Sequence, residues 1–507
     1  MGKFVFADPH IPFLFEKVRK LLAHTYLRVE AQNFSNTLFD TDNMSVIRGG
    51  SMKLRNAITS VGTLLGTRAT RVRVGAEAAV FRMGSADDAL VCMKEARQLL
   101  AREAPEFTIA LATATADTDA LGIDKTAAAV RWTQGRSARL VVPAPAKTLE
   151  ICPLTRVRPA DTAFDGEPPI LSSSAATRKR DGQDLKQKFY TSEVGPELAD
   201  GLQLVNDLQE LSKAGPYPAI DGKMAVLSMD GNSFGKIGAS LKGEDSRHFD
   251  QHLKSLRKRL LTRILNFMTE SKVLPRERAR AGRLRLEVLL WAGDEFQLIV
   301  PAWLGVPLLQ EVFAETSTWR AGAGADSDPL TLSAGLLICS HKMPIHRALH
   351  LAEQIQLRAK SKAKLGPVPV NAWDYLVLES LDYPATMNID QFWQLRLPPG
   401  SAPIPLLACD NYPEKLAVLK RALEEADSRR KVYACAQLIA DPDAPHKVET
   451  GEWQQSSEGT AVHQAVSALL PTAAAQAPQM AWLHLRELWD YILPRPKKAP
   501  APAEEVR

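Results

Sequence analysis

Adjacent carboxylates next to a glycine are the most chemically informative residues in the sequence. The stretch Leu286–Pro301 (LEVLLWAGDEFQLIVP) indicates two apolar strands joined by Ala292-Gly293-Asp294-Glu295. Such a hairpin tip can bind divalent metal ions and phosphates through its carboxylates and backbone groups. The tripeptide alone is a weak signal, because average residue frequencies produce Gly-Asp-Glu by chance in roughly one in ten chains of this length.

A second acidic strand end lies upstream, in Lys223–Gly235 (KMAVLSMDGNSFG). The apolar run Met224–Met229 predicts a buried strand that ends at Asp230. Neighbouring strands lie about 4.8 Å apart, so pairing with the hairpin would bring Asp230 and Asp294 to one edge. Two such carboxylates repel each other unless a divalent cation lies between them.

The turn after Asp230 is a candidate phosphate contact, because backbone N–H groups in turns and at helix starts bind anions. The predicted nucleotide-binding residues of this turn are Gly231, Asn232, Ser233, Phe234 and Gly235. The alternative is purely structural: Asp230 caps a helix, and Gly293-Asp294 is an ordinary hairpin turn. We favour the functional interpretation because the two elements occur together.

A strand and a helix complete this pattern. Pro329–Cys339 predicts a strand, and His341–Lys364 has the apolar spacing of an amphipathic helix. Lys360, Lys362 and Lys364 lie near its C-terminal end, where cations also interact favourably with the helix dipole. We favour phosphate binding for Lys360 and the structural role for the other two.

Taken in order, these motifs over Met224–Leu378 resemble the palm of the large subunit of type III CRISPR effector complexes, in the form without an HD nuclease. That palm is related to diguanylate cyclases and class III nucleotide cyclases. The resemblance implies two Mg²⁺ or Mn²⁺ ions, ATP as the substrate, and synthesis of cyclic oligoadenylates in antiviral defence. The family's GGDEF-like hairpin is usually Gly-Gly-Asp-Asp, whereas Ala292 and Glu295 replace its first Gly and second Asp here.

The resemblance supports a specific site for metal-assisted nucleotidyl transfer. Asp230 and Asp294, with Glu295 and the carbonyl of Gly231 as further ligands, would hold two ions roughly 3.5–4 Å apart. Lys360 would neutralise the triphosphate, and Gly293 would allow the nucleotide to approach the hairpin. Carboxylates, backbone donors and a lysine suffice for such a reaction.

The first third of the sequence contains a weaker copy of the same order of elements. Asn36–Asp40 predicts a strand that ends in an acidic residue. Gly49-Gly50-Ser51 predicts the start of a helix over Met52–Leu65, and Thr70–Phe81 predicts a hairpin. Helix Ala86–Arg102, strand Phe107–Thr113, helix Asp124–Trp132 and strand Ala138–Val142 follow.

This copy is predicted to be non-catalytic. Aligning Gly75 with Gly293 places Ala76 where the second copy has Asp294. A degenerate copy can still bind a nucleotide, and Gly49, Gly50 and Ser51 are the candidate cradle for an acceptor triphosphate. A capped helix start without ligand is an equally good interpretation.

The sequence thus predicts an α+β protein with two ferredoxin-like polymerase/cyclase palm domains in tandem. The expected parts are a degenerate palm at 1–145, an inter-palm linker at 146–220, the acidic palm at 221–380, a helical domain at 381–493 and a disordered tail at 494–507. Ser172–Phe189 and Arg257–Arg285 are basic. We interpret the first as a solvated linker and the second as an exposed helix and turn, and contact with RNA is the alternative for each.

Composition sets further limits. The chain has 507 residues, 45% hydrophobic content and a net charge of +5, which permits nucleic-acid contact without requiring it. Its five cysteines include no Cys-x-x-Cys pair, and no signal peptide or membrane helix is visible, so we expect a cytoplasmic protein. The N-terminal region has no His-Asp dipeptide, which argues against an HD nuclease domain.

Three functions compete. The first is an oligoadenylate synthase that binds nucleoside triphosphates, with guide RNA and RNA-guided subunits as partners. The second is a catalytically silent scaffold in such a complex. The third, a diguanylate cyclase, ranks lowest because Gly238-Ala239 follows Phe234–Ile237, where that family places Asn-Asp to bind guanine.

Overall fold

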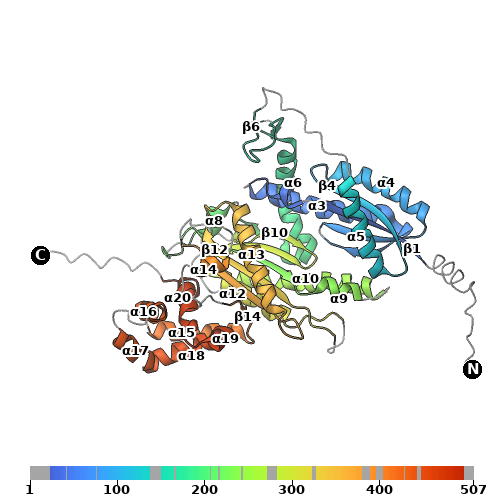
Figure 1. Cartoon of the computed structure of the whole chain (residues 1–507). Helices are drawn as coiled ribbons and strands as arrows, with labels where there is room; N and C mark the ends of the chain where they lie inside the picture. The colour runs from blue at the N-terminus through green and yellow to red at the C-terminus, as the bar shows by residue number, and fades with distance from the viewer. Residues whose placement is uncertain are drawn as a thin grey trace, which may run out of the picture. The chain divides into compact units, whose positions relative to one another are not determined.

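The computed structural model describes most of the chain: residues 23–32, 34–41, 43–75, 77–136, 150–164, 167–205, 207–214, 217–240, 244–270, 283–322, 327–379, 389–394, 404–426, 429–441 and 447–495. The chain divides into two compact units (Figure 1). The first comprises Met1–Lys186 and Gly235–Lys254, and the second comprises Gln187–Phe234 and Ser255–Arg507. The predicted linker at 146–220 is therefore shared between the two units.

The first unit contains a four-stranded antiparallel sheet with the strand order β2-β3-β1-β4. Helix α3 lies in sequence between β1 and β2, and helix α4 between β3 and β4, which is the predicted ferredoxin-like βαββαβ arrangement. Apolar residues of α3 and α4 form a core with one face of this sheet. The elements are β1 (His24–Gln32), α2 (Phe34–Leu38), α3 (Met44–Leu65), η1 (Gly66–Arg68), β2 (Ala69–Val74), β3 (Ala78–Met83), α4 (Ala86–Glu103), β4 (Thr108–Ala116) and α5 (Asp119–Arg136).

Several elements predicted for this unit have other bounds in the structure. Asn36–Asp40 does not form a strand, because Phe34–Leu38 is the short helix α2 and the first strand lies earlier, at β1. The helix expected from Met52 begins at Met44, where the Asn43 side chain caps it by accepting the Val46 N–H at 3.2 Å. The strand predicted at Ala138–Val142 lies outside the described residues.

The basic stretch Ser172–Phe189 is a helix rather than a solvated linker. It belongs to α6 (Ser173–Val194), which crosses α3 at very short range. A Cβ atom on Gly49 would lie 1.8 Å from the carbonyl oxygen of Arg178, and one on Gly182 would lie 1.9 Å from that of Ser45. Arg178 is fully buried and pairs with Asp40 at 2.8 Å. The charges of this helix therefore support the fold.

Short elements precede and follow α6 in the sequence. They are β5 (Thr162–Phe164), β6 (Glu167–Leu171), α7 (Pro196–Ala199), β7 (Gln203–Leu204) and α8 (Leu208–Ser212).

The second unit repeats the strand order of the first. Its six-stranded sheet has the order β10-β11-β8-β12-β13-β14, and β10-β11-β8-β12 corresponds to β2-β3-β1-β4. Strand β13 extends the sheet in parallel with β12, and β14 pairs antiparallel with β13. Residues Gly235–Lys254, which include nearly all of α9 and the first part of α10, belong to the first unit. The elements of this part of the chain are β8 (Lys223–Gly231), α9 (Phe234–Ser240), α10 (Glu244–Glu270), β9 (Arg283–Leu284), β10 (Glu287–Ala292), β11 (Glu295–Pro301), α12 (Ala302–Thr316), β12 (Leu332–Ser340), α13 (Ile345–Ala363), β13 (Ala372–Val377) and β14 (Leu406–Leu407).

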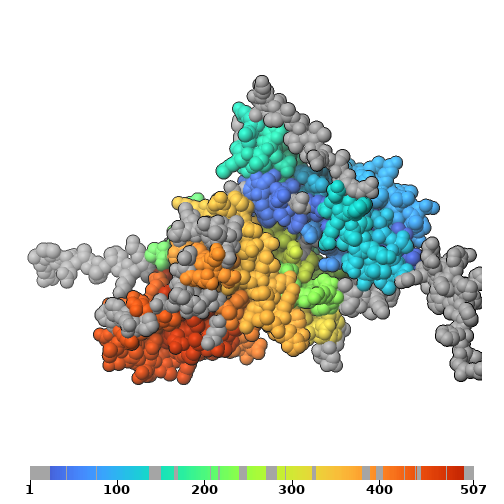
Figure 2. All heavy atoms as spheres, viewed as in Figure 1, coloured from blue at the N-terminus to red at the C-terminus, as the bar shows by residue number. Residues whose placement is uncertain are grey.

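Helices dominate the end of the chain, and those from α15 onward gather into one group in Figure 1 and Figure 2. The Tyr375 hydroxyl on β13 forms a 2.9 Å hydrogen bond with Nδ1 of His484 on α20, which ties this group to the sheet. No helix among the described residues is long and apolar enough to cross a membrane. The helices are α14 (Ile389–Gln394), α15 (Tyr412–Ala426), α16 (Arg429–Ala440), α17 (Lys447–Gln455), α18 (Ser457–Leu469), α19 (Pro471–Gln476) and α20 (Met480–Ile492).

Candidate functional site

Asp230 lies at the end of the buried strand β8, between two partner strands. It is directly opposite Glu295 of β11 and Ser333 of β12. Directly opposite residues of paired antiparallel strands point to the same face of a sheet, so the carboxylates of Asp230 and Glu295 share one face. The side chain of Asp230 is 24% exposed, which leaves it accessible to a ligand.

The hairpin tip between β10 and β11 is held by two hydrogen bonds to its backbone. The carbonyl of Asp294 accepts the N–H of Gly231 at 3.0 Å, and the carbonyl of Gly293 accepts a guanidinium N–H of Arg257 at 3.2 Å. Gly293 has φ +59°, a conformation that favours glycine. The sequence placed Arg257, on α10, in a basic stretch but did not predict this contact, because nothing in its local pattern indicates a partner 36 residues away.

Gly231 allows the carboxylate of Asp294 to lie directly against the end of β8. A Cβ atom at this position would lie 2.6 Å from Oδ2 of Asp294 and 2.7 Å from the ring of Phe234. Only glycine fits there without displacing one of these groups. The structure thus brings Asp230 and Asp294 to one edge of the sheet, as the expected strand pairing requires.

Lys360 completes this edge. Its ammonium contacts Oδ2 of Asp230, and its side chain is 21% exposed. Two residues earlier on α13, Arg358 contacts Asp374 of β13 and pairs with Asp390 at 2.9 Å. Burial raises the pKa of Asp374 to about 6, while the positive charge of Arg358 opposes this rise. The C-terminal turn that carries Lys360 is therefore anchored to the sheet.

Two residues of the predicted phosphate-binding turn have structural roles. The Asn232 side chain is fully buried: its amide donates to Oγ1 of Thr331 at 3.0 Å, and its Oδ1 accepts from Ser333 at 2.7 Å. Phe234 is also buried, beside Gly231. We reassign both side chains from nucleotide contact to support of the sheet edge. Ser233, between them, has φ +66°. The nucleotide contacts predicted for Ser233, Gly235 and Gly293 stay predictions.

The first unit has acidic residues at the equivalent positions. The N–H of Ala31 donates to the carbonyl of Glu77 at 2.7 Å, as that of Gly231 does to Asp294. Glu30 lies opposite Ala78, as Asp230 lies opposite Glu295. Glu77 is therefore the counterpart of Asp294, and Glu30 that of Asp230. The predicted alignment of Ala76 with Asp294 is wrong, because this hairpin loop is one residue longer.

This acidic pair in the first unit is compensated by arginine. Nε of Arg28 lies 2.5 Å from Glu30. Burial, and secondarily the charge of Glu30, raise the pKa of Glu77. A guanidinium thus lies on Glu30 much as the ammonium of Lys360 lies on Asp230.

Gly49, Gly50 and Ser51 do not form a helix start. They lie in the second turn of α3, where Gly49 and Gly50 are buried against α6. Backbone N–H groups that far inside a helix are already bonded to carbonyls of the preceding turn. The predicted phosphate cradle is therefore wrong.

The donor set at the second-unit edge suits Mg²⁺ together with a nucleotide. Among the described residues, no group of three or more His, Cys, Asp or Glu side chains is arranged to hold a metal. Mg²⁺ in nucleotide sites uses one or two carboxylates and takes its other ligands from water and phosphates. Asp230 and Asp294, with Glu295 on the same face, meet this requirement if Lys360 moves off Asp230.

Comparison with known families identifies the domain that carries this edge. The family model "Cas10/Cmr2, second palm domain" matches residues 223–365. This part of the chain is therefore similar to the Cas10/Cmr2 second palm. The resemblance that the sequence suggested over Met224–Leu378 is confirmed, and the chain is Cas10-like. The second palm contains Asp230, Asp294, Glu295 and Lys360, and the first βαββαβ unit makes the tandem arrangement.

Solved structures with a similar trace include Csm1 proteins. A Csm1–Csm4 cassette in complex with pppApApA is 14% identical, with a TM-score of 0.48 and coverage of 94% of this chain and 70% of that chain. The cassette in complex with cA4 is 13% identical with a TM-score of 0.47, covering 95% and 71%. Csm1 in T. onnurineus is 12% identical with a TM-score of 0.46, covering 93% and 69%. Similarity at this level carries no argument about function. No match was found among curated proteins.

Proposed function

We propose that the second palm joins ATP into cyclic or linear oligoadenylates. The observation that carries this proposal is that Asp230 and Asp294 share one sheet edge with Lys360, in a domain that matches the Cas10/Cmr2 second palm. The resemblance to oligoadenylate-forming palms suggests ATP as the substrate. The proposed metal ligands are Asp230 and Asp294, with Glu295 and the carbonyl of Gly231 as further candidates.

Each residue of this edge has its own role in the proposed reaction. In the reaction, a ribose hydroxyl loses its proton to solvent water and its oxygen forms a bond to the α-phosphorus of ATP, while the bond from that phosphorus to pyrophosphate breaks. Divalent cations, when bound, supply Lewis-acid activation of the hydroxyl and of the leaving group. Asp230 and Asp294 provide the fixed negative charge that binds them. Lys360 transfers its positive charge from Asp230 to the triphosphate and so stabilises the departing pyrophosphate.

The experiment is direct. Purified protein is incubated with each nucleoside triphosphate separately and with Mg²⁺ or Mn²⁺, and products are identified by mass spectrometry. We expect linear or cyclic oligoadenylates from ATP alone. Asp230→Asn and Asp294→Asn should each abolish product while the far-UV circular dichroism stays unchanged. Product retained in either variant would contradict the proposal.

A second candidate is a silent scaffold in an RNA-guided effector complex. Two observations favour it: Ala292 and Glu295 depart from the usual hairpin motif, and Lys360 forms an ion pair with Asp230. The same incubation, repeated with candidate guide RNA and RNA-guided subunits, separates the two functions. Stable co-purification with those subunits and no product under any condition would favour the scaffold.

A further inference from the structure

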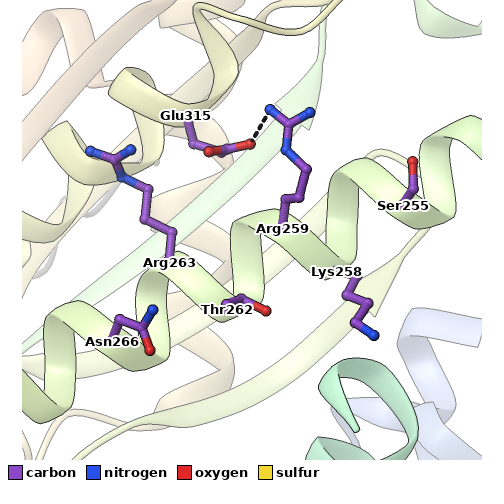
Figure 3. A pocket seen from close by; sticks show the side chains of 7 residues that line it. All are labelled: Ser255, Lys258, Arg259, Thr262, Arg263, Asn266 and Glu315. Atoms are coloured by element: carbon purple, nitrogen blue, oxygen red, sulfur yellow. Dashed lines mark ion pairs between the residues drawn. The ribbon is translucent and has the colours of Figure 1, made fainter. Parts of the chain in front are cut away.

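A groove of about 440 Å³ lies between α10 and α12 of the second unit (Figure 3). We call it the α10 groove. It shares no residue with the acidic edge of the second palm. Its lining consists of polar and charged side chains, namely Ser255, Lys258, Arg259, Thr262, Arg263, Asn266 and Glu315.

Three side chains along this groove have uncommitted hydrogen-bonding groups. Lys258, Thr262 and Asn266 follow one another at four-residue intervals, a rise of about 6 Å per step on a helix. No side-chain hydrogen bond or ion pair involves any of the three within the part of the chain that the structure describes. By contrast, Thr269 on the same helix donates its hydroxyl to the carbonyl of Leu265 at 2.8 Å. The row is therefore available to an external partner.

Two arginines beside the row are held in place by carboxylates of α12. Arg259 pairs with Glu315 at 2.7 Å, and Arg263 pairs with Glu311 at 2.7 Å. Each guanidinium has five N–H donors, so these pairs fix its orientation and leave further donors unused. Lys258 adds a positive charge that no carboxylate of the groove neutralises. The face thus keeps an excess of positive charge over the two glutamates.

We propose that the α10 groove binds the phosphodiester backbone of a single-stranded nucleic acid. Arg, Lys, Thr and Asn are side chains that contact phosphates and sugars, and their regular spacing suits a repeating anion better than a single one. No aromatic side chain lines the groove, so the bases do not stack there and binding is independent of sequence. This use of the basic helix goes beyond oligoadenylate synthesis and does not depend on it.

The test is fluorescence anisotropy of the full chain with a labelled uridine homopolymer and its deoxythymidine counterpart. We expect both to bind, with affinity falling steeply between about 50 and 200 mM salt. Lys258→Glu should weaken binding about tenfold and reduce the salt slope by about one or more. Arg421→Glu is the matched control: it makes the same change of charge on an exposed residue of another helix, α15, and should leave binding near wild type.

A second variant guards against an indirect effect. Thr262→Glu places a carboxylate in the middle of the row and should weaken binding to a similar degree, with a melting temperature near that of wild type. Asp230→Asn should bind the strands normally, which separates this proposal from the proposed reaction. Equal loss in Lys258→Glu and Arg421→Glu, or no binding of either strand, would overturn the proposal. Polyglutamate, added at the same concentration of negative charges, is the competitor. If it displaced the labelled strands, the proposal would also be overturned, because the groove would then bind carboxylates in preference to phosphates.

Discussion

Lys360 near the end of α13 forms an ion pair with Asp230 at the end of β8, 130 residues earlier in the chain. The pair places a positive charge on one of the two carboxylates proposed to bind metal. A cation and an ammonium compete for the same oxygen atoms, so the proposed function requires Lys360 to leave Asp230 when a metal–nucleotide complex binds. In that proposal, the negative charge of the triphosphate would attract the Lys360 ammonium away from Asp230.

Replacing Lys360 should therefore have opposite effects on metal binding and on turnover. In Lys360→Met, we expect Mn²⁺ to bind several-fold more tightly without nucleotide, because the competing ammonium is gone. Oligoadenylate synthesis should fall by about two orders of magnitude, because one charged group opposite the triphosphate is lost. Electron paramagnetic resonance measures free Mn²⁺, and mass spectrometry measures product. The control is Lys362→Met, two residues along the same helix, which should change neither quantity. Weaker Mn²⁺ binding in Lys360→Met would contradict the idea that Lys360 and the metal compete for Asp230.

Gly231→Ala should misplace Asp294 without unfolding the sheet. The new methyl group would lie 2.6 Å from the Asp294 carboxylate, so that side chain must move. We expect loss of nearly all synthesis and a destabilisation of about 1–3 kcal/mol, measured by urea unfolding. Gly451→Ala is the control, because a Cβ atom there has nothing within 4 Å. Full activity in Gly231→Ala would show that the position of Asp294 does not matter.

The second palm was predictable because its signals are local. Met224–Met229 is a continuous apolar run, the hairpin has a glycine at its tip, and α13 has regular apolar spacing. Each pattern defines its own element, and the antiparallel pairing of β8 with β11 then places the acids together. The contact of Lys360 with Asp230 needed the fold, since no local pattern sets the direction of a lysine side chain.

The first unit was harder to predict because its signals depend on distant contacts. Gly49 suggests a turn in sequence, yet it is there to let α6 approach, and α6 lies more than 120 residues further along. The low apolar content of α6 suggested a linker, because the partner that allows Arg178 to be buried, Asp40, is equally distant. The register of the first hairpin was missed by one residue because the extra loop residue has no counterpart in the second.

Gly49→Ala tests this helix crossing. A Cβ atom 1.8 Å from the carbonyl oxygen of Arg178 must separate α3 from α6, since neither backbone can move alone. We expect the first unit to lose about 3 kcal/mol of stability, seen as faster hydrogen–deuterium exchange in both helices. Ser51→Ala, two residues along α3, should leave exchange near wild type. Unchanged exchange in Gly49→Ala would contradict the crossing.

His484 should make the second unit sensitive to acid. Burial lowers its pKa from 6.5 to about 4, so the folded state keeps the ring neutral while the unfolded chain takes up a proton below pH 6.5. The stability that the neutral ring contributes is present above pH 6.5 and is lost as the pH falls toward 4, up to about 3 kcal/mol. Urea unfolding of His484→Gln from pH 7 to 4 should show a correspondingly smaller loss than wild type. Identical pH profiles would exclude this role, and exposed His248→Gln serves as the control.

The most direct measurement is a crystal structure of the protein with Mn²⁺ and a non-reactive ATP analogue. The account predicts anomalous density within about 2.0–2.3 Å of carboxylate oxygens of both Asp230 and Asp294, with Lys360 turned to the phosphates. A bound analogue with no ion at these carboxylates, or with Lys360 still on Asp230, would contradict it.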